Sequence, residues 1–429
     1  MERRSRRARA LSRFLWGVAT SAFQLEGAPA CDWTSWKVKD EADRAARLRG
    51  VGHLERTEED LGLLSRLGVS AYRFSVEWSR VAPRRREWNR KEMDRYVRIA
   101  ARLRDTGIEP VVTLHHFTNP EWIANGAAWA EEDAASEFLR FAENAVRALR
   151  EHVRLWVTFN EPNVYVTGGY LGALMPPGKK NLREGFGAYA NILSAHASVY
   201  DLIHAAASEK PAVGIAHSMV AFRPYAEKSS LDCWAAKVAH AFYNQSLLEA
   251  FRTGTLSLRL PFLHEEAFPV GTRGKLDFLG VNYYFRLFMR LSLTSLRGPE
   301  YFWEDRKGRG LTESGWEVYP KGFEEALQTA SSAGFPLVVT ENGAAETDDR
   351  RKIAYMKDHL RVLHRLIREG MDIRGYFWWS LMDNYEWLEG LRPRFGLYRV
   401  DFDSLDRVPT RSADFYSRWI RRHPEPRKP

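Results

Sequence analysis

Two glutamates stand where apolar, strand-like runs of the chain end. Residues 155–159 read Leu-Trp-Val-Thr-Phe and lead to Asn160 and Glu161, and residues 336–340 read Pro-Leu-Val-Val-Thr and lead to Glu341. Two carboxyl groups at the carboxyl ends of buried strands are what hydrolysis of a glycosidic bond requires, one as acid and base and the other as nucleophile. Either glutamate alone could simply end a strand beside water. The pair, together with the elements around it, favours catalysis.

Eight strand-like runs alternate with amphipathic, helix-like segments along the chain. The expected strands are Leu15–Thr20, Ala71–Ser75, Glu109–Leu114, Leu155–Asn160, Ala212–His217, Phe278–Asn282, Pro336–Thr340 and Ile373–Trp379. The expected helices are Thr57–Leu67, Asn89–Thr106, Glu132–Glu151, Gly187–Ser208, Leu231–Arg252, Lys321–Ala333 and Arg351–Glu369. Apolar strands with a helix between each successive pair predict an α/β fold, a single-domain (β/α)8 TIM barrel with its active site at the C-terminal ends of the strands.

A doubly wound open sheet is the alternative architecture. It would need a glycine-rich phosphate turn after its first strand, and residues 19–24, Ala-Thr-Ser-Ala-Phe-Gln, do not provide one. The barrel is also favoured by the positions of the polar and aromatic residues that stand at or just beyond a strand end, which are Gln24, Arg73, His116, Asn160, Glu161, Asn282, Tyr284, Glu341 and Trp379. Barrels of this type carry their chemistry on that face.

The chain has 429 residues, 45% apolar content and 15 Trp, without a low-complexity tract or a flexible linker, which indicates one domain. Its two cysteines, Cys31 and Cys233, cannot form a disulfide framework or a metal cluster and suit a reducing compartment. We expect no membrane span and no signal peptide, so the protein is expected to be cytoplasmic.

The net charge of +9 lies mainly in the two ends of the chain. Residues 1–13 carry a net +5 and residues 421–429 a net +3, which leaves +1 for everything between them. We therefore expect a basic N-terminal tail at 1–13, a barrel domain at 14–420 and a basic C-terminal tail at 421–429. A nucleic-acid enzyme would be expected to carry its basic stripe within the fold, so nucleic acid is an unlikely partner.

Several motifs in this order resemble glycoside hydrolase family 1, the β-glucosidase family of retaining glycosidases, from Phe14 to about Tyr416. Besides the two glutamate motifs, they are the runs at 14–27 (Phe-Leu-Trp-Gly-Val-Ala-Thr-Ser-Ala-Phe-Gln-Leu-Glu-Gly), 72–75 (Tyr-Arg-Phe-Ser), 277–284 (Asp-Phe-Leu-Gly-Val-Asn-Tyr-Tyr) and 379–387 (Trp-Ser-Leu-Met-Asp-Asn-Tyr-Glu-Trp). Any one of these runs could match the family by chance, but all of them in this order are highly specific for it.

The resemblance implies a role for each matching residue. Glu161 would be the acid/base and Glu341 the nucleophile. Arg73 and Tyr284 would flank and orient the nucleophile, with Asn282 as a polar neighbour. The residues implied to hold the sugar hydroxyls are Gln24, His116, Asn160, Glu386 and Trp387, with Trp379 as the aromatic floor under the ring and Trp316 as the wall behind the leaving group.

The physical chemistry agrees with these implied roles. A sugar presents hydroxyls around an apolar ring face, so its site needs amide, imidazole and carboxylate groups beside a flat aromatic ring. Arg73 should hold Glu341 ionised by opposite-charge attraction, whereas burial and the nearby Glu341 should keep Glu161 protonated. Adjacent residues on a strand point to opposite faces, so His115 and His116 are not expected to ligate one metal and Trp378 is expected in the core.

The resemblance implies a retaining exo-β-glycosidase that releases terminal β-glucosyl, β-galactosyl or β-fucosyl units without a metal or organic cofactor. Glu386 stands where relatives acting on 6-phosphorylated sugars typically carry a serine, so a non-phosphorylated, oxygen-linked, small β-glycoside or oligosaccharide is the expected substrate. The segment from Tyr284 to Gly315 is short for the family, which is expected to open the leaving-group side. Transglycosylation through the same intermediate and a non-catalytic glycan-binding relative are the alternatives, and the oligomeric state is left open.

Overall fold

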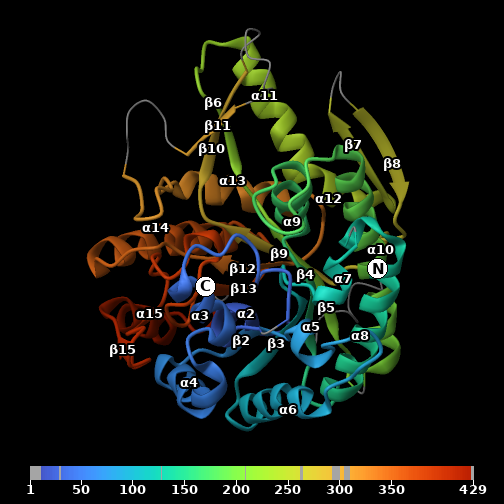
Figure 1. The fold of residues 1–429 in the computed structure, drawn as a ribbon. Coiled ribbons are helices and arrows are strands. Elements are labelled where there is room, and N and C mark those ends of the chain that lie inside the picture. Colours follow the sequence, from blue (N-terminus) through green and yellow to red (C-terminus); the bar gives the residue numbers. More distant parts are fainter. Residues whose placement is uncertain are drawn as a thin grey trace.

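Eight parallel strands close into a barrel at the centre of the molecule (Figure 1). The computed structural model describes residues 11–426 apart from 29, 127, 208, 261–263, 292–299 and 304–309. The barrel strands are β1 (Leu15–Ala19), β2 (Ala71–Ser75), β3 (Glu109–His115), β4 (Leu155–Asn160), β5 (Ala212–Ser218), β9 (Phe278–Tyr283), β12 (Leu337–Asn342) and β13 (Ile373–Trp379). Every predicted strand is present, with its ends shifted by two residues at most, so the predicted barrel is confirmed.

The barrel closes because β1 pairs on both of its edges. Ala19 lies opposite Trp379 of β13 and opposite Arg73 of β2. Around the rest of the barrel the strands follow chain order, and β5 pairs directly with β9. All the strands are parallel, so their carboxyl ends, with the polar residues that follow them, meet at one end of the barrel.

Side chains fill the barrel inside and cover it outside, in alternation along each strand. In β1, Leu15 and Ala19 belong to the interior cluster, whereas Trp16 and Val18 pack with the surrounding helices. The interior cluster includes Val111, Leu155, Val157, Ala216, Phe278, Val338 and Phe377. Because both faces are buried, the strands read as continuous apolar runs rather than alternating ones.

The longer helices follow the barrel strands in chain order, and all but the one at residues 230–240, which lies beside a separate sheet, surround the barrel. They are α4 (His53–Leu67), α6 (Arg90–Asp105), α8 (Glu132–Leu149), α10 (Leu182–Ala206), α11 (Ser230–His240), α12 (Ser246–Thr253), α13 (Pro320–Ser331), α14 (Asp349–Arg368) and α15 (Arg411–Arg422). Three predictions need correction, and the first is that the helix expected from Gly187 begins at Leu182. The helix expected from Thr57 begins at His53, and the helix expected over Leu231–Arg252 is divided by a one-turn π-helical segment, Ala241–Gln245.

Shorter elements lie in the loops. The helices are α2 (Ala22–Glu26), α3 (Glu41–Arg49), α5 (Trp78–Val81), α7 (Glu121–Ala124) and α9 (Pro162–Val166). A three-stranded sheet of β6 (Ala221–Pro224), β10 (Arg286–Arg290) and β11 (Glu300–Phe302) stands away from the barrel beside α11 (Figure 1). Two-stranded sheets are formed by β7 (Thr255–Leu260) with β8 (His264–Pro269) and by β14 (Tyr398–Val400) with β15 (Arg407–Pro409).

The two ends of the described chain meet beside the first strand. The indole Nε1 of Trp16 donates to the carbonyl oxygen of His423 at 2.7 Å, and the backbone N–H of Phe14 donates to Glu425. The predicted domain boundaries stay a prediction. No helix within the described ranges has both the length and the apolar character needed to cross a membrane.

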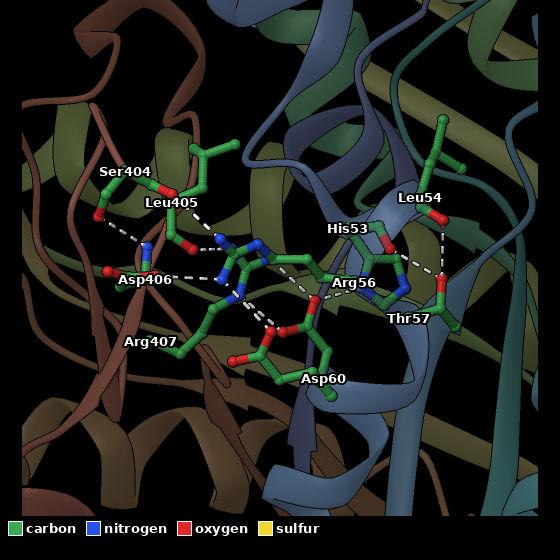
Figure 2. Close-up of polar contacts among 10 residues, drawn as sticks. His53, Leu54, Arg56, Thr57, Asp60, Ser404, Leu405, Asp406 and Arg407 are labelled. Atoms are coloured by element: carbon green, nitrogen blue, oxygen red, sulfur yellow. Dashed lines mark hydrogen bonds and ion pairs between the residues drawn. The ribbon is translucent and has the colours of Figure 1, made fainter.

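A buried ion pair joins α4 to the C-terminal sheet (Figure 2). Arg407 of β15 donates to both carboxylate oxygens of Asp60, at 2.7 and 3.0 Å, and His53 Nδ1 lies 2.7 Å from the same carboxylate. The side chains of Asp60 and Arg407 are fully buried. Burial by itself raises the pKa of Asp60, but the hydrogen bonds from His53 and Arg407 outweigh burial and leave that pKa below its usual value. This contact ties residues 347 positions apart in the chain.

We expect Arg407→Ala to lower the free energy of unfolding by about 3–5 kcal/mol, because it leaves the Asp60 carboxylate buried without its cation. Arg56→Ala is the matched control. Its guanidinium pairs with Asp406 in the same region but is partly exposed, so its loss should cost less than about 1 kcal/mol. The thermal unfolding midpoints of the two variants measure the difference. Equal midpoints would mean that the buried pair does not stabilise the fold.

Candidate active site

All twelve residues singled out in the sequence lie at the carboxyl-end face of the barrel or on the loops that follow its strands. Those within or directly after barrel strands are Arg73 (β2), His116 (after β3), Asn160 and Glu161 (end of β4), Asn282 and Tyr284 (end of β9), Glu341 (β12) and Trp379 (end of β13). Those on connecting segments are Gln24 (α2), Trp316 (before α13) and the pair Glu386 and Trp387 (after β13). Contacts among them join strands from opposite sides of the barrel.

One hydrogen-bond network links the two glutamates. Arg73 donates from Nη1 to Glu341 Oε1 at 2.5 Å and from Nη2 to Asn160 Oδ1 at 2.7 Å. The side-chain amide of Asn282 donates to the same Asn160 oxygen at 3.1 Å and to Glu161 Oε1 at 2.9 Å. Three intervening side chains therefore connect one carboxyl group to the other, which brings residues 180 positions apart in the chain into one cluster.

Glu341 carries the cationic partner of the pair. Besides the ion pair with Arg73, its Oε2 accepts a hydrogen bond from the Tyr284 hydroxyl at 2.7 Å. Burial raises the pKa of Glu341 above its usual value, and the Arg73 guanidinium and the Tyr284 hydrogen bond offset only part of that rise. Both partners favour the ionised carboxylate and direct its two oxygens.

Glu161 lies in an environment that favours its protonated form. Burial, followed by the charge of Glu341, raises the pKa of Glu161 to about 8. Its hydrogen-bond partner Asn282 is neutral, and no ion pair to Glu161 is formed among the described residues. Of the two carboxyl groups, Glu341 is thus the one placed to hold the negative charge and Glu161 the one placed to hold a proton.

A local irregularity precedes each glutamate. The pairing of β4 with β5 shifts register between Val157 and Asn160, and the pairing of β12 with β9 shifts between Val339 and Glu341. Bulges of this kind re-aim side chains beside active sites. Glu161 also has left-handed backbone angles, φ 46° and ψ 59°, which are unusual for a residue other than glycine.

The backbone after Glu341 requires a glycine. A Cβ atom on Gly343 would overlap the carbonyl oxygen of Trp379 on the neighbouring strand. The close approach of these two backbones explains why the motif reads Thr-Glu-Asn-Gly at this point. It also fixes the end of β12 against the end of β13, where Trp379 stands.

A second polar group lies at the closed end of the cluster. The Gln24 amide donates to Glu386 Oε2 at 3.2 Å, and the Trp379 indole donates to Glu386 Oε1 at 3.2 Å. Burial raises the pKa of Glu386 to about 8, while the Trp379 hydrogen bond opposes that rise. A carboxyl group held between an amide and an indole can bind the hydroxyls of a polyol.

His116 is held between two tryptophan rings. Its ring is stacked 5.8 Å from Trp379 and 6.1 Å from Trp387, and its Nε2 lies 3.2 Å from the Asn160 amide. Burial and the nearby Arg73 charge place the pKa of His116 well below its usual value, so the ring is neutral. Its buried Nδ1 has no hydrogen-bond partner within the described structure and can accept or donate a bond to a ligand.

The neighbouring residues on the same strands face outward. His115 lies 3.1 Å from the Asn119 side chain and packs among core aromatics, and Trp378 donates to the carbonyl oxygen of Phe395. The expected alternation of faces is therefore observed. In the part of the chain that the structure describes, no group of three or more His, Cys, Asp or Glu side chains is arranged to hold a metal ion.

Three supporting residues were missed in the sequence. Thr340 donates to Asn282 Oδ1 at 2.6 Å, which turns the Asn282 amide toward Glu161. Thr113 accepts from Arg73 Nε at 3.0 Å, and Asn384 accepts from the Gln24 amide at 2.9 Å. Thr340 and Asn384 lie inside the motifs shared with the family, so the sequence could have indicated them as site residues. Thr113 lies within a strand outside those motifs, and nothing in the sequence distinguishes it from other strand residues.

Comparison with known proteins identifies the family. The model described as glycosyl hydrolase family 1 matches residues 7–425. The chain belongs to glycosyl hydrolase family 1. Beta-glucosidase A of Thermotoga maritima is 31% identical to it over 95% of this chain and 97% of its own length. A beta-galactosidase of Pyrococcus woesei is 29% identical over 92% of this chain and 94% of its own.

A solved structure supports the same placement. The beta-glycosidase from Pyrococcus horikoshii matches with a TM-score of 0.86 and 37% identity, over 96% of this chain and 94% of that one. As a member of family 1, the protein is a glycoside hydrolase of the β-glycosidase type. The shortness of the segment from Tyr284 to Gly315 stays a prediction, since residues 292–299 and 304–309 lie outside the described residues.

We expect kcat/KM for a glycoside with a poor leaving group to fall as the pH rises through about 8, because Glu161 loses the proton that it would donate. A dinitrophenyl glycoside should lack this alkaline limb, since its leaving group departs without protonation. Rate measurements from pH 5 to pH 10, roughly the range in which such limbs are resolved, test this. If kcat/KM for the dinitrophenyl glycoside also falls above pH ~8, the fall would be assigned to ionisation of Glu386 rather than of Glu161.

Proposed function

We propose that the protein is a retaining exo-β-glycosidase that hydrolyses terminal, non-reducing β-D-glycosyl residues of non-phosphorylated O-glycosides. The observation that carries this proposal is the contrast between two buried carboxyl groups in one network. Glu341 is paired with Arg73, whereas Glu161 has a pKa raised to about 8 and a neutral partner. A double displacement needs this division between a nucleophile and a proton donor.

In the first step, Glu341 attacks the anomeric carbon and the glycosidic C–O bond breaks. Glu161 gives its proton to the leaving oxygen, so the aglycone departs as a neutral alcohol, and the sugar becomes esterified to Glu341. Esterification removes the negative charge that raises the pKa of Glu161. The ionised Glu161 then takes a proton from water as the water oxygen attacks the anomeric carbon, which releases Glu341 and a sugar with its original configuration.

Attack on a terminal sugar is supported by the burial of one end of the cluster. Gln24, His116 and Asn160 are all buried there, although Glu386 and Trp387 beside them are partly exposed. A sugar whose hydroxyls the three buried side chains hold would have little room to continue as a chain in that direction. The opposite end includes Tyr284 and Trp316, which are partly exposed. The leaving group would therefore point toward Trp316, and only the last unit of a glycan would reach the carboxyl groups.

A non-phosphorylated substrate is supported by the partners of Glu386. Its carboxyl oxygens accept from Gln24 and Trp379, neither of which is a cation. A sugar phosphate needs arginine or lysine at its anionic group. The choice between glucosyl and galactosyl units depends on the position of one hydroxyl, and relatives with both names share this fold. We propose β-glucosides as the first substrates to test, with β-galactosides and β-fucosides beside them.

Replacing Glu341 by Ala should reduce turnover of an aryl β-glucoside by roughly 10⁶-fold, as removal of a nucleophile does in other covalent mechanisms. Azide should then enter the vacated space, attack the anomeric carbon in a single displacement and give an α-glycosyl azide. Product analysis by NMR measures the configuration. Turnover by the Glu341→Ala variant that matches the wild type would remove Glu341 from the mechanism.

Glu161→Ala is the matched control, because it removes the other carboxyl group from the same network. With a dinitrophenyl β-glucoside it should still form the glycosyl-enzyme, and azide should intercept that intermediate to give the β-glycosyl azide. An α-product from both variants would contradict the assigned roles. Wild-type protein that binds glycans but releases no reducing sugar would favour the non-catalytic alternative, and dominant alkyl glycoside formation with added alcohol would favour transglycosylation.

A further inference from the structure

A row of aromatic rings leads from Glu341 to the surface of the protein. Tyr284, whose hydroxyl contacts Glu341, packs 5.6 Å from the ring of Trp316. Trp316 lies 6.1 Å from Trp303, with the two ring planes inclined by only 21°. Trp303 in turn lies 6.1 Å from Tyr301, whose ring plane is almost perpendicular to it, at 89°. The rings thus continue two steps beyond the wall that the sequence resemblance assigned to Trp316.

The outer part of this row is exposed, which is unusual for large aromatic residues in this chain. The exposed fraction of Trp303 is 39% and that of Tyr301 is 50%, and they are the two aromatic residues among the large exposed apolar side chains in the described ranges. Tyr301 lies on β11, the edge strand of the sheet that stands away from the barrel, and Trp303 directly follows it (Figure 1). Adjoining exposed aromatic side chains provide an apolar surface on which a ligand can stack.

Phe285 packs against both tryptophans. Its ring lies 4.9 Å from Trp316 and 4.8 Å from Trp303. Phe285 directly follows Tyr284 in the chain, so the support of the outer tryptophan is continuous with the residue that contacts the nucleophile. Rings fixed by such contacts lose little conformational entropy when a ligand stacks on them.

We propose that Trp316, Trp303 and Tyr301 form an aromatic track that binds the leaving group when it is a β-linked oligosaccharide. The proposal rests on the function proposed above, since it assumes that the bond is cut between Glu161 and Glu341. A single aryl group would need one ring, and Trp316 would suffice. A track of three rings fits a leaving group of several sugar units, each of which presents an apolar face to an aromatic side chain.

The track predicts that substrate chain length matters. The leaving sugar of a disaccharide reaches Trp316, whereas the second and third leaving units of a tetrasaccharide reach Trp303 and Tyr301. In the wild type, kcat/KM should therefore rise from cellobiose to cellotetraose. Trp303→Ala should lower the ratio of kcat/KM for cellotetraose to that for cellobiose by about tenfold, mainly through KM, the size of effect expected for one lost stacking contact.

Two variants control for damage to the fold. Trp303→Phe keeps an aromatic ring and should restore most of the ratio. Trp88→Ala removes another partly exposed tryptophan, which packs on Phe141 on the outer side of the barrel, and should leave the ratio unchanged. If Trp303→Ala does not fold, Tyr301→Ala should lower the same ratio in the same direction, because Tyr301 is the outermost ring.

A binding measurement separates this proposal from the proposed function. In a Glu341→Gln background, which cannot turn over, calorimetric titration with cellotetraose should show a dissociation constant about tenfold weaker when Trp303→Ala is added. If the wild-type protein releases no glucose and Trp303→Ala still weakens cellotetraose binding, the proposed function would be overturned and the track supported. An unchanged dissociation constant, or an equal loss of kcat/KM for cellobiose and cellotetraose, would overturn the track.

The remaining alternative is that the exposed rings pack against a second copy of the chain. In that case Trp303→Ala would lower the molecular mass measured in solution by light scattering. A change in mass without a change in the cellotetraose ratio would overturn the track and assign this face to self-association.

Discussion

The buried guanidinium of Arg73 is the contact on which the site depends. It joins β2 to Glu341 of β12 and to Asn160 of β4, and so spans three strands of the barrel interior. A fully buried arginine is stable there only with its charge and its donors satisfied, and the carboxylate of Glu341, the Asn160 amide oxygen and Thr113 meet that need. The requirement is reciprocal, because Glu341 keeps its charge in the interior only beside a cation. The Arg73–Glu341 ion pair therefore fills the barrel interior near the carboxyl ends of its strands. It also gives the two glutamates different protonation states, because only Glu341 lies beside the cation.

Precision in the site comes from departures from regular strand geometry. Strict alternation along β4 and β12 would fix the direction of each side chain by its position alone. The register shifts before Glu161 and Glu341 break that alternation where the two carboxyl groups must face one cluster. The left-handed backbone of Glu161 adds a local cost of the order of 1–3 kcal/mol, which the surrounding barrel must offset. Strain of this kind is tolerated because the strands beneath are packed on both faces.

The site also differs from one end to the other. At the closed end, the buried amide of Gln24 and the buried ring of His116 lie beside Trp379, with the half-buried Glu386 and Trp387 next to them, which suits a single sugar unit with many hydroxyls. At the open end, the polar groups give way to aromatic rings that are increasingly exposed, from Tyr284 to Trp303 and Tyr301. Both ends agree with a substrate that enters by its last unit and leaves the rest of its chain near the surface.

The sequence by itself determined the barrel and the positions of its strands, because buried parallel strands are read directly from apolar runs. The motifs shared with the family pointed to twelve residues that the structure places at one face of the barrel, and their roles stay a prediction. It also indicated which of two adjacent residues faces the core, as for Trp378 and Trp379, since alternation is a local property. It did not reveal that α4 begins at His53, because Thr57 followed three residues later by Asp60 resembles a helix start. In the structure the Thr57 hydroxyl donates to the carbonyl oxygen of His53, and the Asp60 carboxylate is bound by Arg407, 347 positions away.

Only the tertiary structure decided how the site residues meet. The hydrogen bonds from Arg73 through Asn160 and Asn282 to Glu161 join strands that are far apart in the chain. Thr113 also binds Arg73, although no sequence motif indicated it. The raised pKa of Glu161 and the aromatic row to Tyr301 likewise depend on burial and on contacts between separate segments. Local patterns fix which residues form a strand, but distances, charges and register shifts arise when the strands close on one another, because only then do distant side chains share one environment.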